Sequence, residues 1–491
     1  MYETPTATTI VQKATRSVKW SALMEVVSRT ATPIIMVILA RLLTPADFGV
    51  VAMAMIAISF AQMFWDAGLS KALIQTNKIA DEAAHVVFWT NLILGLIIYA
   101  LVFITAPGVA VFFNSPHSGP VLRVLGLQII IASLSTVQQA LFVRELDFRR
   151  LFWIKLFTAF FPGFFSIPLA FYGFGVWALV AGSLAGQMLN LMFLWRYSSW
   201  RPRLQYDLPL AREMLKFGLW VVAESFGAWL IVWGDNLIVG RFLGVHDLGV
   251  YRTGWMLATI IFGLVLNPFL SVLYAAFSRL QNDLPALKEN FHKVNRVLMA
   301  LALPIGLGLL LIGPELASIL FGSKWQGLGL VLRVIGLMLG LTWVVGINPE
   351  LYRAMGRPDI NTKLMFVAIL YYLPAYWIAA KFGLEIFVYV RFGVALVTIP
   401  IHIYLCRRML NVSPFYLWHD GKNFILAAIA MGIGLGIVKW GIHSIAPALP
   451  QALTLAFVIV MGSGIYTATL WVLDRAFILQ TLRLIRRAAM A

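Results

Sequence analysis

Long apolar stretches follow one another along almost the whole chain, and Pro, Gly and charged residues separate them. Fourteen stretches can be marked, over residues 18–41, 47–70, 84–106, 121–143, 152–171, 174–195, 214–240, 248–274, 294–313, 328–351, 363–380, 384–405, 422–442 and 450–473. A helix of about 20 residues crosses the ~30 Å hydrocarbon core of a bilayer, and most of these stretches reach that length. The pattern predicts an all-α polytopic membrane protein with about 14 transmembrane helices. Two links, residues 172–175 and 381–385, are short and contain glycine, so we expect hairpins there.

Two sequence segments occur twice. Residues 41–50 return at 241–250, with Arg, Leu, Asp, Gly and Val at matching positions, and residues 121–127 return at 331–337 with one difference. The second copies follow in the same order and at nearly equal sequence offsets, 200 and 210 residues, which indicates an internal duplication. Because six spans per repeat is an even number, we expect two six-helix lobes that point the same way, plus two C-terminal helices.

The duplication and the charge pattern predict the domain organisation. The expected parts are a cytoplasmic segment (1–17), an N-lobe (18–195), a cytoplasmic linker (196–213), a C-lobe (214–405), two further spans (422–473) and a basic amphipathic tail (474–491). The first apolar stretch is too long for a signal peptide, so we expect it to remain as an anchor.

The composition excludes an ordinary soluble domain. Hydrophobic residues make up 61% of the chain, charged residues 12%, and the formal net charge is +17. The basic residues form short clusters between alternate spans, such as Arg144, Arg149, Arg150 and Lys155, as in cytoplasmic loops. We therefore expect a cytoplasmic N-terminus and C-terminus and no nucleic-acid partner. Cys406 is the single cysteine, so no intramolecular disulfide forms, and no cofactor is expected.

Ionisable residues inside the spans are the candidates for function, since charge in hydrocarbon normally faces a bundle interior or a water-filled path. Glu25 and Arg29 lie one turn apart in the first span. Either they neutralise each other as an ion pair, or Arg29, close to the midplane, faces the central path. Arg252 and Arg391 are the other candidate cations, although Arg252 lies near a span end and either snorkels or binds substrate.

Two acids in the seventh span are candidates for cation coupling. Glu224 lies about a third of the way along it, and either binds a proton or Na⁺ or hydrogen-bonds across a helix interface. Asp235 lies further on, and alternatively pairs with Arg241.

The chain has no room for a catalytic domain, because the turns between spans are short. It also lacks a Walker A sequence, an HExxH motif and a nucleophile elbow. Transport is therefore favoured over catalysis. A cavity with Arg29, Arg252 and Arg391 suits an anionic ligand, particularly a diphosphate. The alternatives are a cation-coupled multidrug exporter, which favours acids in its cavity, and a membrane glycosyltransferase or polymerase, which favours a large external loop.

Several segments resemble the Wzx-like polysaccharide transporters of bacteria. They are ARLLTPADFGV at 40–50, DAGLSKALIQ at 66–75, DNLIVGRFLG at 235–244 and ILFGSKW at 319–325. VLYAAFSRLQ at 272–281, followed by NFHK at 290–293, resembles the colanic-acid-exporter branch. The resemblance covers most of residues 10–410 and little beyond.

This resemblance implies the fold of the multidrug/oligosaccharidyl-lipid/polysaccharide exporter superfamily in the bacterial inner membrane. It implies a flippase that moves an undecaprenyl-diphosphate-linked oligosaccharide across the membrane for polysaccharide export, by alternating access driven by a H⁺ or Na⁺ gradient. A substrate-binding cavity with Arg29, Arg252, Arg391 and Glu25, coupling through Glu224 and Asp235, and a polysaccharide polymerase or export machinery as partner are the expectations that follow.

Overall fold

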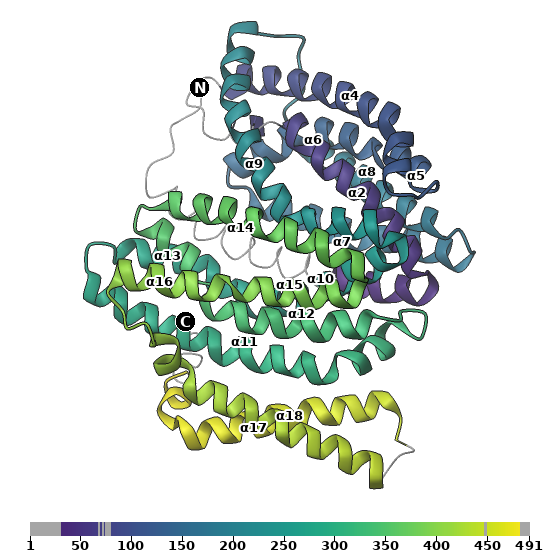
Figure 1. Cartoon of the computed structure of the whole chain (residues 1–491). Coiled ribbons are helices and arrows are strands. Elements are labelled where there is room, and N and C mark those ends of the chain that lie inside the picture. Colours follow the sequence, from purple (N-terminus) through teal and green to yellow (C-terminus); the bar gives the residue numbers. More distant parts are fainter. Residues whose placement is uncertain (1–30, 67–68, 71–72, 74–79, 446–448, 482–491) are drawn as a thin grey trace. The chain divides into compact units, whose positions relative to one another are not determined.

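The computed structural model describes residues 31–66, 69–70, 73, 80–445 and 449–481, and every regular element in these residues is helical (Figure 1). The chain divides into two compact units, residues 1–252 and 253–491. Helix α10 (Gly244–Arg279) begins in the first unit and continues in the second.

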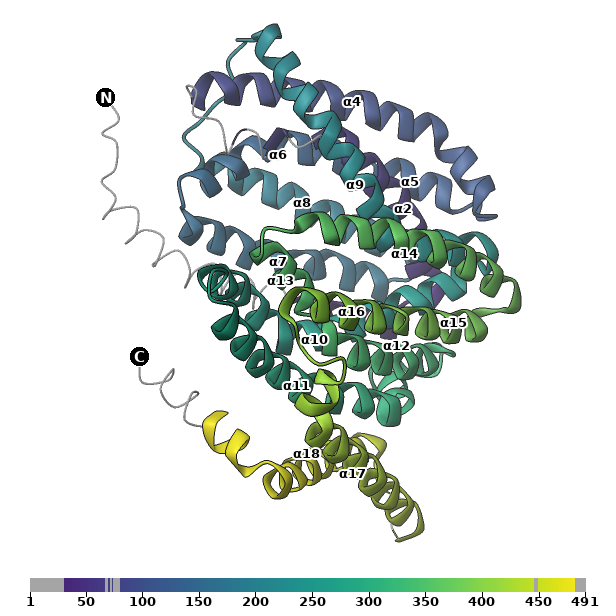
Figure 2. The same ribbon diagram turned by 60° about the vertical axis from the view of Figure 1, so that its left-hand side comes forward.

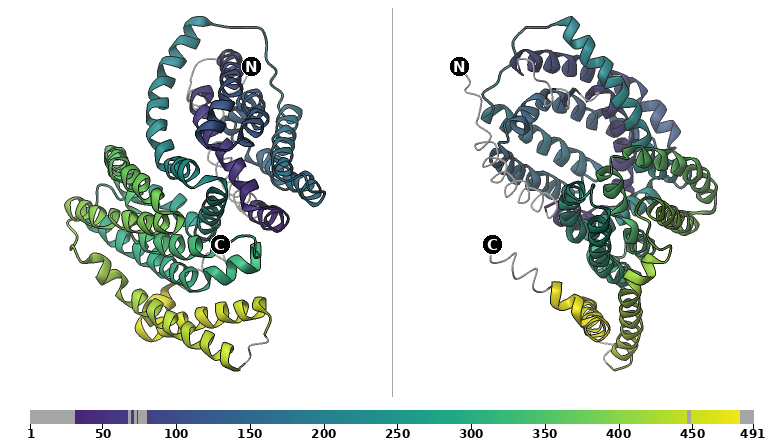
Figure 3. Two further views of the ribbon diagram at one scale, coloured as in Figure 1. Left: turned by 45° about the vertical axis from the view of Figure 1, so that its right-hand side comes forward. Right: turned by 90° about the vertical axis from the view of Figure 1, so that its left-hand side faces the viewer.

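The first unit starts, in its described part, with a short helix, Ala31–Leu42. The helices that follow are α2 (Pro45–Asp66), α4 (Ala80–Phe112), α5 (Ser118–Leu125), α6 (Leu127–Arg144), α7 (Phe148–Phe171), α8 (Val176–Tyr197) and α9 (Leu208–Phe242). Helices α7 and α8 form a hairpin whose turn contains two glycines with positive φ, Gly173 (83°) and Gly175 (55°). This confirms the hairpin predicted from the Gly-containing link. Helix α9 is visibly bent (Figure 3).

The second unit continues from α10 with a further set of long helices. They are α11 (Leu284–Phe321), α12 (Leu328–Thr342), the short 3₁₀ helix η1 (Trp343–Val345), α13 (Asn348–Ala354), α14 (Pro358–Ala379), the 3₁₀ helix η2 (Ala380–Phe382), α15 (Leu384–Leu396), α16 (Thr398–Leu410), α17 (Tyr416–Ile445) and α18 (Gln451–Leu473). Helices α14, α15, α12 and α11 lie side by side in this order (Figure 1), and α11 runs obliquely to α14 and α15 (Figure 2).

Most of the predicted spans correspond to helices of membrane-crossing length. Among the described residues, 12 helical segments are long and apolar enough to cross a membrane. The predicted spans 18–41 and 214–240 are not among these 12: the first is described only from Ala31, and in the second, which belongs to α9, a large part of the side chains lies outside the described residues. Three predicted spans contain helix breaks, namely 121–143, 328–351 and 384–405.

Aspartate side chains start several helices. Asp207 accepts a hydrogen bond from the backbone N–H of Leu210 (3.0 Å), and Asp283 accepts one from Ala286 (3.0 Å). Each of these acids is followed by Leu-Pro, so α9 and α11 begin with the same capping sequence. The first N–H groups of a helix have no carbonyl acceptor within the helix. Each aspartate side chain supplies an acceptor to one of them.

In both copies of the segment that occurs at 121–127 and 331–337, the arginine makes the same kind of hydrogen bond. In the first, Arg123 donates from Nε to the carbonyl of Phe103 on the preceding long helix (3.2 Å). In the second, Arg333 donates from Nε to the carbonyl of Leu310 on α11 (3.0 Å). Both guanidinium groups thus tie their helix to the one before it, as expected for a duplicated sequence.

The other duplicated segment brings its two copies into contact with each other. A Cβ added to Gly49, on α2, would lie 1.8 Å from the carbonyl oxygen of Val245, and one added to Gly249, on α10, would lie 1.9 Å from that of Pro45. The two contacts are reciprocal, because Val245 is the counterpart of Pro45 in the repeat. The backbones touch here, and only glycine permits this approach.

The segment between α8 and α9 is held against the start of α4. The indole Nε1 of Trp89 donates to the carbonyl of Arg203 (2.8 Å), and the N–H of Arg203 donates to Nδ1 of His85 (3.1 Å). The hydroxyls of Thr90 and Tyr206 lie 3.2 Å apart in a further hydrogen bond. These bonds fix an otherwise irregular segment to a helix in the same unit.

Helices α17 and α18 form a pair that is anchored to α11 by ionic contacts. Arg296 on α11 pairs with Asp474, just after α18, and His292 lies 2.6 Å from Asp420 of α17. Nearer the other end of α11, Nζ of Lys439 contacts Oε1 of Glu315 (2.5 Å). Apolar side chains of α11, α17 and α18 fill the space around these contacts. The predicted tail, 474–491, is described only to residue 481, where it is helical.

The glycine contact leads to a first prediction. Replacing Gly249 by Ala places a methyl group against the backbone of α2, so we expect a loss of stability on the order of 3 kcal/mol and a lower melting temperature in detergent. Gly464→Ala is the matched control, because a Cβ at Gly464 meets nothing within 4 Å. A G249A protein as stable as G464A would show that the two helix starts do not pack this closely.

Candidate functional site

The guanidinium of Arg391 lies among aromatic side chains inside the second unit. Arg391, on α15, is only 8% exposed. Its Cζ atom lies 4.2 Å from the ring centre of Trp255 on α10 and 5.6 Å from that of Tyr376 on α14. Three helices therefore position one buried cation, and the aromatic faces attract it without adding negative charge.

The guanidinium of Arg252 is positioned in a similar way in the first unit. Its Cζ atom lies 4.4 Å from the ring centre of Trp233 on α9. Arg252 lies two turns into α10 and is half-buried. The two described arginines of the predicted cationic cavity thus share one environment, an aromatic ring from a neighbouring helix.

Asp235 joins α9 to α10 through hydrogen bonds. It is 4% exposed, and its Oδ2 accepts a hydrogen bond from the hydroxyl of Tyr251 (2.5 Å). Its Oδ1 accepts from the side-chain amide (2.6 Å) and the backbone N–H (2.7 Å) of Asn236. Tyr251 is itself fully buried, so the pair forms a polar contact at the α9–α10 corner. Burial of this carboxylate is compensated by these bonds.

The other three predicted site residues lie wholly or partly outside the part of the chain that the structure describes. Glu25 and Arg29 lie outside the described residues, and so does the side chain of Glu224, whose backbone belongs to α9. Within the described residues, no group of three His, Cys, Asp or Glu side chains is arranged to hold a metal ion. The aromatic partners Trp255, Tyr376 and Trp233 were not predicted, because aromatic residues in an apolar span do not stand out from the pattern.

Comparison with known proteins identifies the family. A family model described as "Polysaccharide biosynthesis protein" matches residues 38–329, more than half of the chain. The chain belongs to this family. The chain is also similar to the lipopolysaccharide biosynthesis protein WzxC of Escherichia coli K12, which is 26% identical over 451 residues, 88% of this chain and 89% of WzxC.

Two other relatives cover about two thirds of the chain. The succinoglycan biosynthesis transport protein ExoT of Rhizobium meliloti is 27% identical over 336 residues, which is 68% of either chain. The teichuronic acid biosynthesis protein TuaB of Bacillus subtilis is 24% identical over 341 residues, again 68% of either chain. These similarities agree with the Wzx-like resemblance found in the sequence motifs.

Solved structures show that the fold is that of a known group of transporters. The lipid II flippase MurJ, in an inward closed conformation, superimposes with a TM-score of 0.76 at 13% identity, over 94% of this chain and 100% of MurJ. An inward-facing multidrug resistance transporter of the MATE family gives 0.60 at 14% identity, over 79% and 96%. At such low identity the likeness establishes the fold alone, and it confirms the predicted all-α polytopic membrane fold, whereas the count of 14 spans stays a prediction.

The contact between Tyr251 and Asp235 gives a second prediction. Tyr251→Phe removes the hydroxyl that donates to a buried carboxylate, so we expect a destabilisation of about 1–3 kcal/mol and a lower melting temperature. Tyr404→Phe is the control, because Tyr404 is 61% exposed. If both variants melt at the wild-type temperature, the carboxylate does not depend on this bond.

Proposed function

We propose that this protein is a flippase that moves an undecaprenyl-diphosphate-linked oligosaccharide across the cell membrane for export of a polysaccharide. One observation carries the proposal. The chain belongs to a polysaccharide biosynthesis family, and its described residues form helices of which almost all are long enough to cross a membrane. Such a chain contributes to polysaccharide synthesis by moving an intermediate and is not an enzyme. The similarity to ExoT, named as a transport protein, and to WzxC supports this assignment.

The charges in the spans support an anionic substrate. Arg391 and Arg252 lie on helices that cross the membrane, and each is held by aromatic rings. A guanidinium presents its N–H groups in a fork that matches the oxygens of a diphosphate. We assign Arg252, Arg391 and Arg29 to the path of the sugar–diphosphate group, with Glu25 beside Arg29. The drug-exporter alternative would favour acids over arginines in this role.

The proposed mechanism is alternating access driven by a H⁺ or Na⁺ gradient. We assign coupling to Glu224 first, since the Asp235 carboxylate already takes part in the α9–α10 contact. We also propose an inner-membrane location with cytoplasmic N- and C-termini, from the distribution of Lys and Arg. A polysaccharide polymerase or other export machinery is the proposed partner that receives the flipped oligosaccharide.

Transport measurements test the arginine assignment. The protein is reconstituted into proteoliposomes with a fluorescent undecaprenyl-diphosphate oligosaccharide, and the rate at which the label changes leaflet is followed. Arg391→Gln should lower the rate about tenfold or more, and Arg391→Lys should be intermediate, because lysine keeps the charge but lacks the fork. Arg407→Gln, on an exposed face of α16, is the control.

Two results would contradict the assignment. Wild-type rates in Arg391→Gln and Arg252→Gln would remove these residues from the substrate path. Export of a cationic dye by a wild-type protein that moves no lipid-linked oligosaccharide would favour the drug exporter. Arg29→Ala belongs to the same series: full activity there would leave Arg29 as a structural partner of Glu25.

Ion gradients test the coupling residue. In the same liposomes, an imposed proton or Na⁺ gradient should accelerate wild-type flipping, and Glu224→Gln should abolish that acceleration while leaving the basal rate largely unchanged. Amide and carboxyl side chains have similar shapes, so the change removes the titratable group and little else. Retained acceleration in Glu224→Gln would assign coupling elsewhere, with Asp235→Asn as the next variant to measure.

A further inference from the structure

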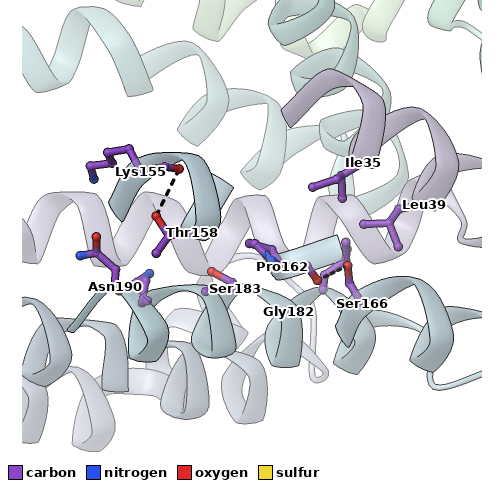
Figure 4. Close-up of a pocket in the computed structure, with 12 residues that line it drawn as sticks. Ile35, Leu39, Lys155, Thr158, Pro162, Ser166, Gly182, Ser183 and Asn190 are labelled. Carbon is purple, nitrogen blue, oxygen red and sulfur yellow. Dashed lines mark hydrogen bonds between the residues drawn. The ribbon is translucent and has the colours of Figure 1, made fainter. Parts of the chain in front are cut away.

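The first unit contains a pocket of about 410 Å³ between α7, α8 and the Ala31–Leu42 helix (Figure 4). On α7 its lining residues are Lys155, Thr158, Pro162 and Ser166, at spacings that place all four on one face of the helix. The facing side of α8 contributes small and polar residues. Neither Arg252 nor Arg391 lines this pocket.

Glycines on α8 explain how the helices approach each other on one side of the pocket. A Cβ on Gly182 would lie 2.8 Å from the carbonyl oxygen of Pro162, and one on Gly186 would lie 2.7 Å from its ring. Past Gly186, the α8 lining changes to the larger polar residues Gln187 and Asn190. Helices α7 and α8 therefore touch at Gly182 and Gly186, and beyond Gly186 polar side chains line the pocket between them.

The two ends of the pocket differ in chemistry. Figure 4 shows Lys155, Thr158 and Asn190 together at one end and Ile35 and Leu39 at the other. The hydroxyls that line the pocket are already bonded: Ser166 donates to the carbonyl of Pro162 (2.7 Å), Thr158 donates to that of Lys155 (3.4 Å), and Ser183 accepts from Gln128 (3.0 Å). The polar groups that still need partners are gathered at the Lys155 end.

Two groups at the polar end lack protein partners within the described part of the chain. The Oδ1 atom of Asn190 is buried and accepts no hydrogen bond. None of the described residues that line the pocket is acidic, and Lys155 makes no ion pair with them. In addition, Pro162 has no N–H, so the carbonyl of Thr158 lacks its intrahelical donor. The polar end thus combines the Lys155 ammonium group with two oxygen acceptors that lack a donor, Asn190 Oδ1 and the Thr158 carbonyl. A ligand that carries both a negative charge and hydroxyl groups suits this combination.

The depth of Lys155 indicates where such a ligand comes from. Lys155 lies three residues into the apolar span predicted from the sequence (152–171), about 5 Å along the helix, and just after Arg149 and Arg150. Ile35, Leu39 and Leu179 line the other part of the pocket. A polar end near one boundary, followed along the helices by apolar lining residues, matches the two parts of a lipid molecule.

We propose that this pocket binds an anionic membrane lipid, with the phosphate at Lys155, a headgroup hydroxyl at Asn190 and the start of a hydrocarbon chain along Pro162 toward Leu39. The lipid is a bilayer phospholipid of the phosphatidylglycerol type. It is held in the first unit, in a pocket that neither Arg252 nor Arg391 lines, and its binding does not depend on the proposed function. The ordinary alternative is that Lys155 snorkels to the interface, which leaves Asn190 Oδ1 without a donor.

Native mass spectrometry of the full-length, delipidated protein tests this proposal. The protein is titrated with phosphatidylglycerol, with phosphatidylethanolamine and with undecaprenyl phosphate. We expect one tightly held phosphatidylglycerol, preferred over phosphatidylethanolamine about tenfold, and a similar loss of affinity in Lys155→Gln. Asn190→Leu should weaken binding several-fold, and Lys155→Arg should retain it.

Lys381→Gln is the matched control, because it removes one lysine of the second unit that lies over Trp377 and does not line the pocket. Equal losses in K155Q and K381Q would overturn the proposal, since net charge alone would then explain binding. Unchanged binding in both K155Q and N190L would overturn it as well. Displacement of phosphatidylglycerol by undecaprenyl phosphate, with the same dependence on Lys155, would keep the phosphate site and assign it to the carrier lipid.

Discussion

Charge has no water to solvate it inside a bilayer, and this constraint explains how the polar residues of the chain are placed. The ammonium of Lys439 meets Glu315, the carboxylate of Asp235 meets Tyr251, and the guanidinium of Arg391 meets aromatic faces. The three groups thus meet an opposite charge, a hydroxyl donor and aromatic faces respectively, and each of these partners offsets part of the free energy that burial of a charge costs.

Close packing in the bilayer depends on glycine, because lipid is as apolar as the helices and gives no hydrophobic driving force for their association. Gly306 of α11 and Gly340 of α12 face each other so closely that a Cβ on either would lie 2.7 Å from the Cα of the other. Gly182 and Gly186 bring α8 against Pro162 in the same way. Glycine thus sets where helices touch, and the larger residues beyond such a contact line the space that is left, as in the Lys155 pocket.

The sequence predicted the features that depend on local composition. Span positions follow from hydropathy alone, and the charges inside the spans contrast with their surroundings, so both were found. The break at Gly126 between α5 and α6 was missed, because the surrounding residues are apolar on both sides. The partners of the charges were also missed: Trp255 and Arg391 are separated by more than a hundred residues, and no spacing rule links them. Lys155 was grouped with the cytoplasmic cations, since charge counting cannot tell a loop from the first turns of a helix.

Helix α11 contacts both the α17–α18 pair and α12 in the second unit. It carries Arg296 and Glu315, 19 residues and about 28 Å apart, and both are bonded to the α17–α18 pair. Two anchors at separate heights resist both sliding and rotation, whereas one anchor would allow the pair to pivot. The glycine contact at Gly306 ties α12 to the same helix. Any rearrangement of the second unit that moves α11 must therefore carry the C-terminal pair with it, so these two helices, which lie beyond the repeat, form one mechanical body with α11.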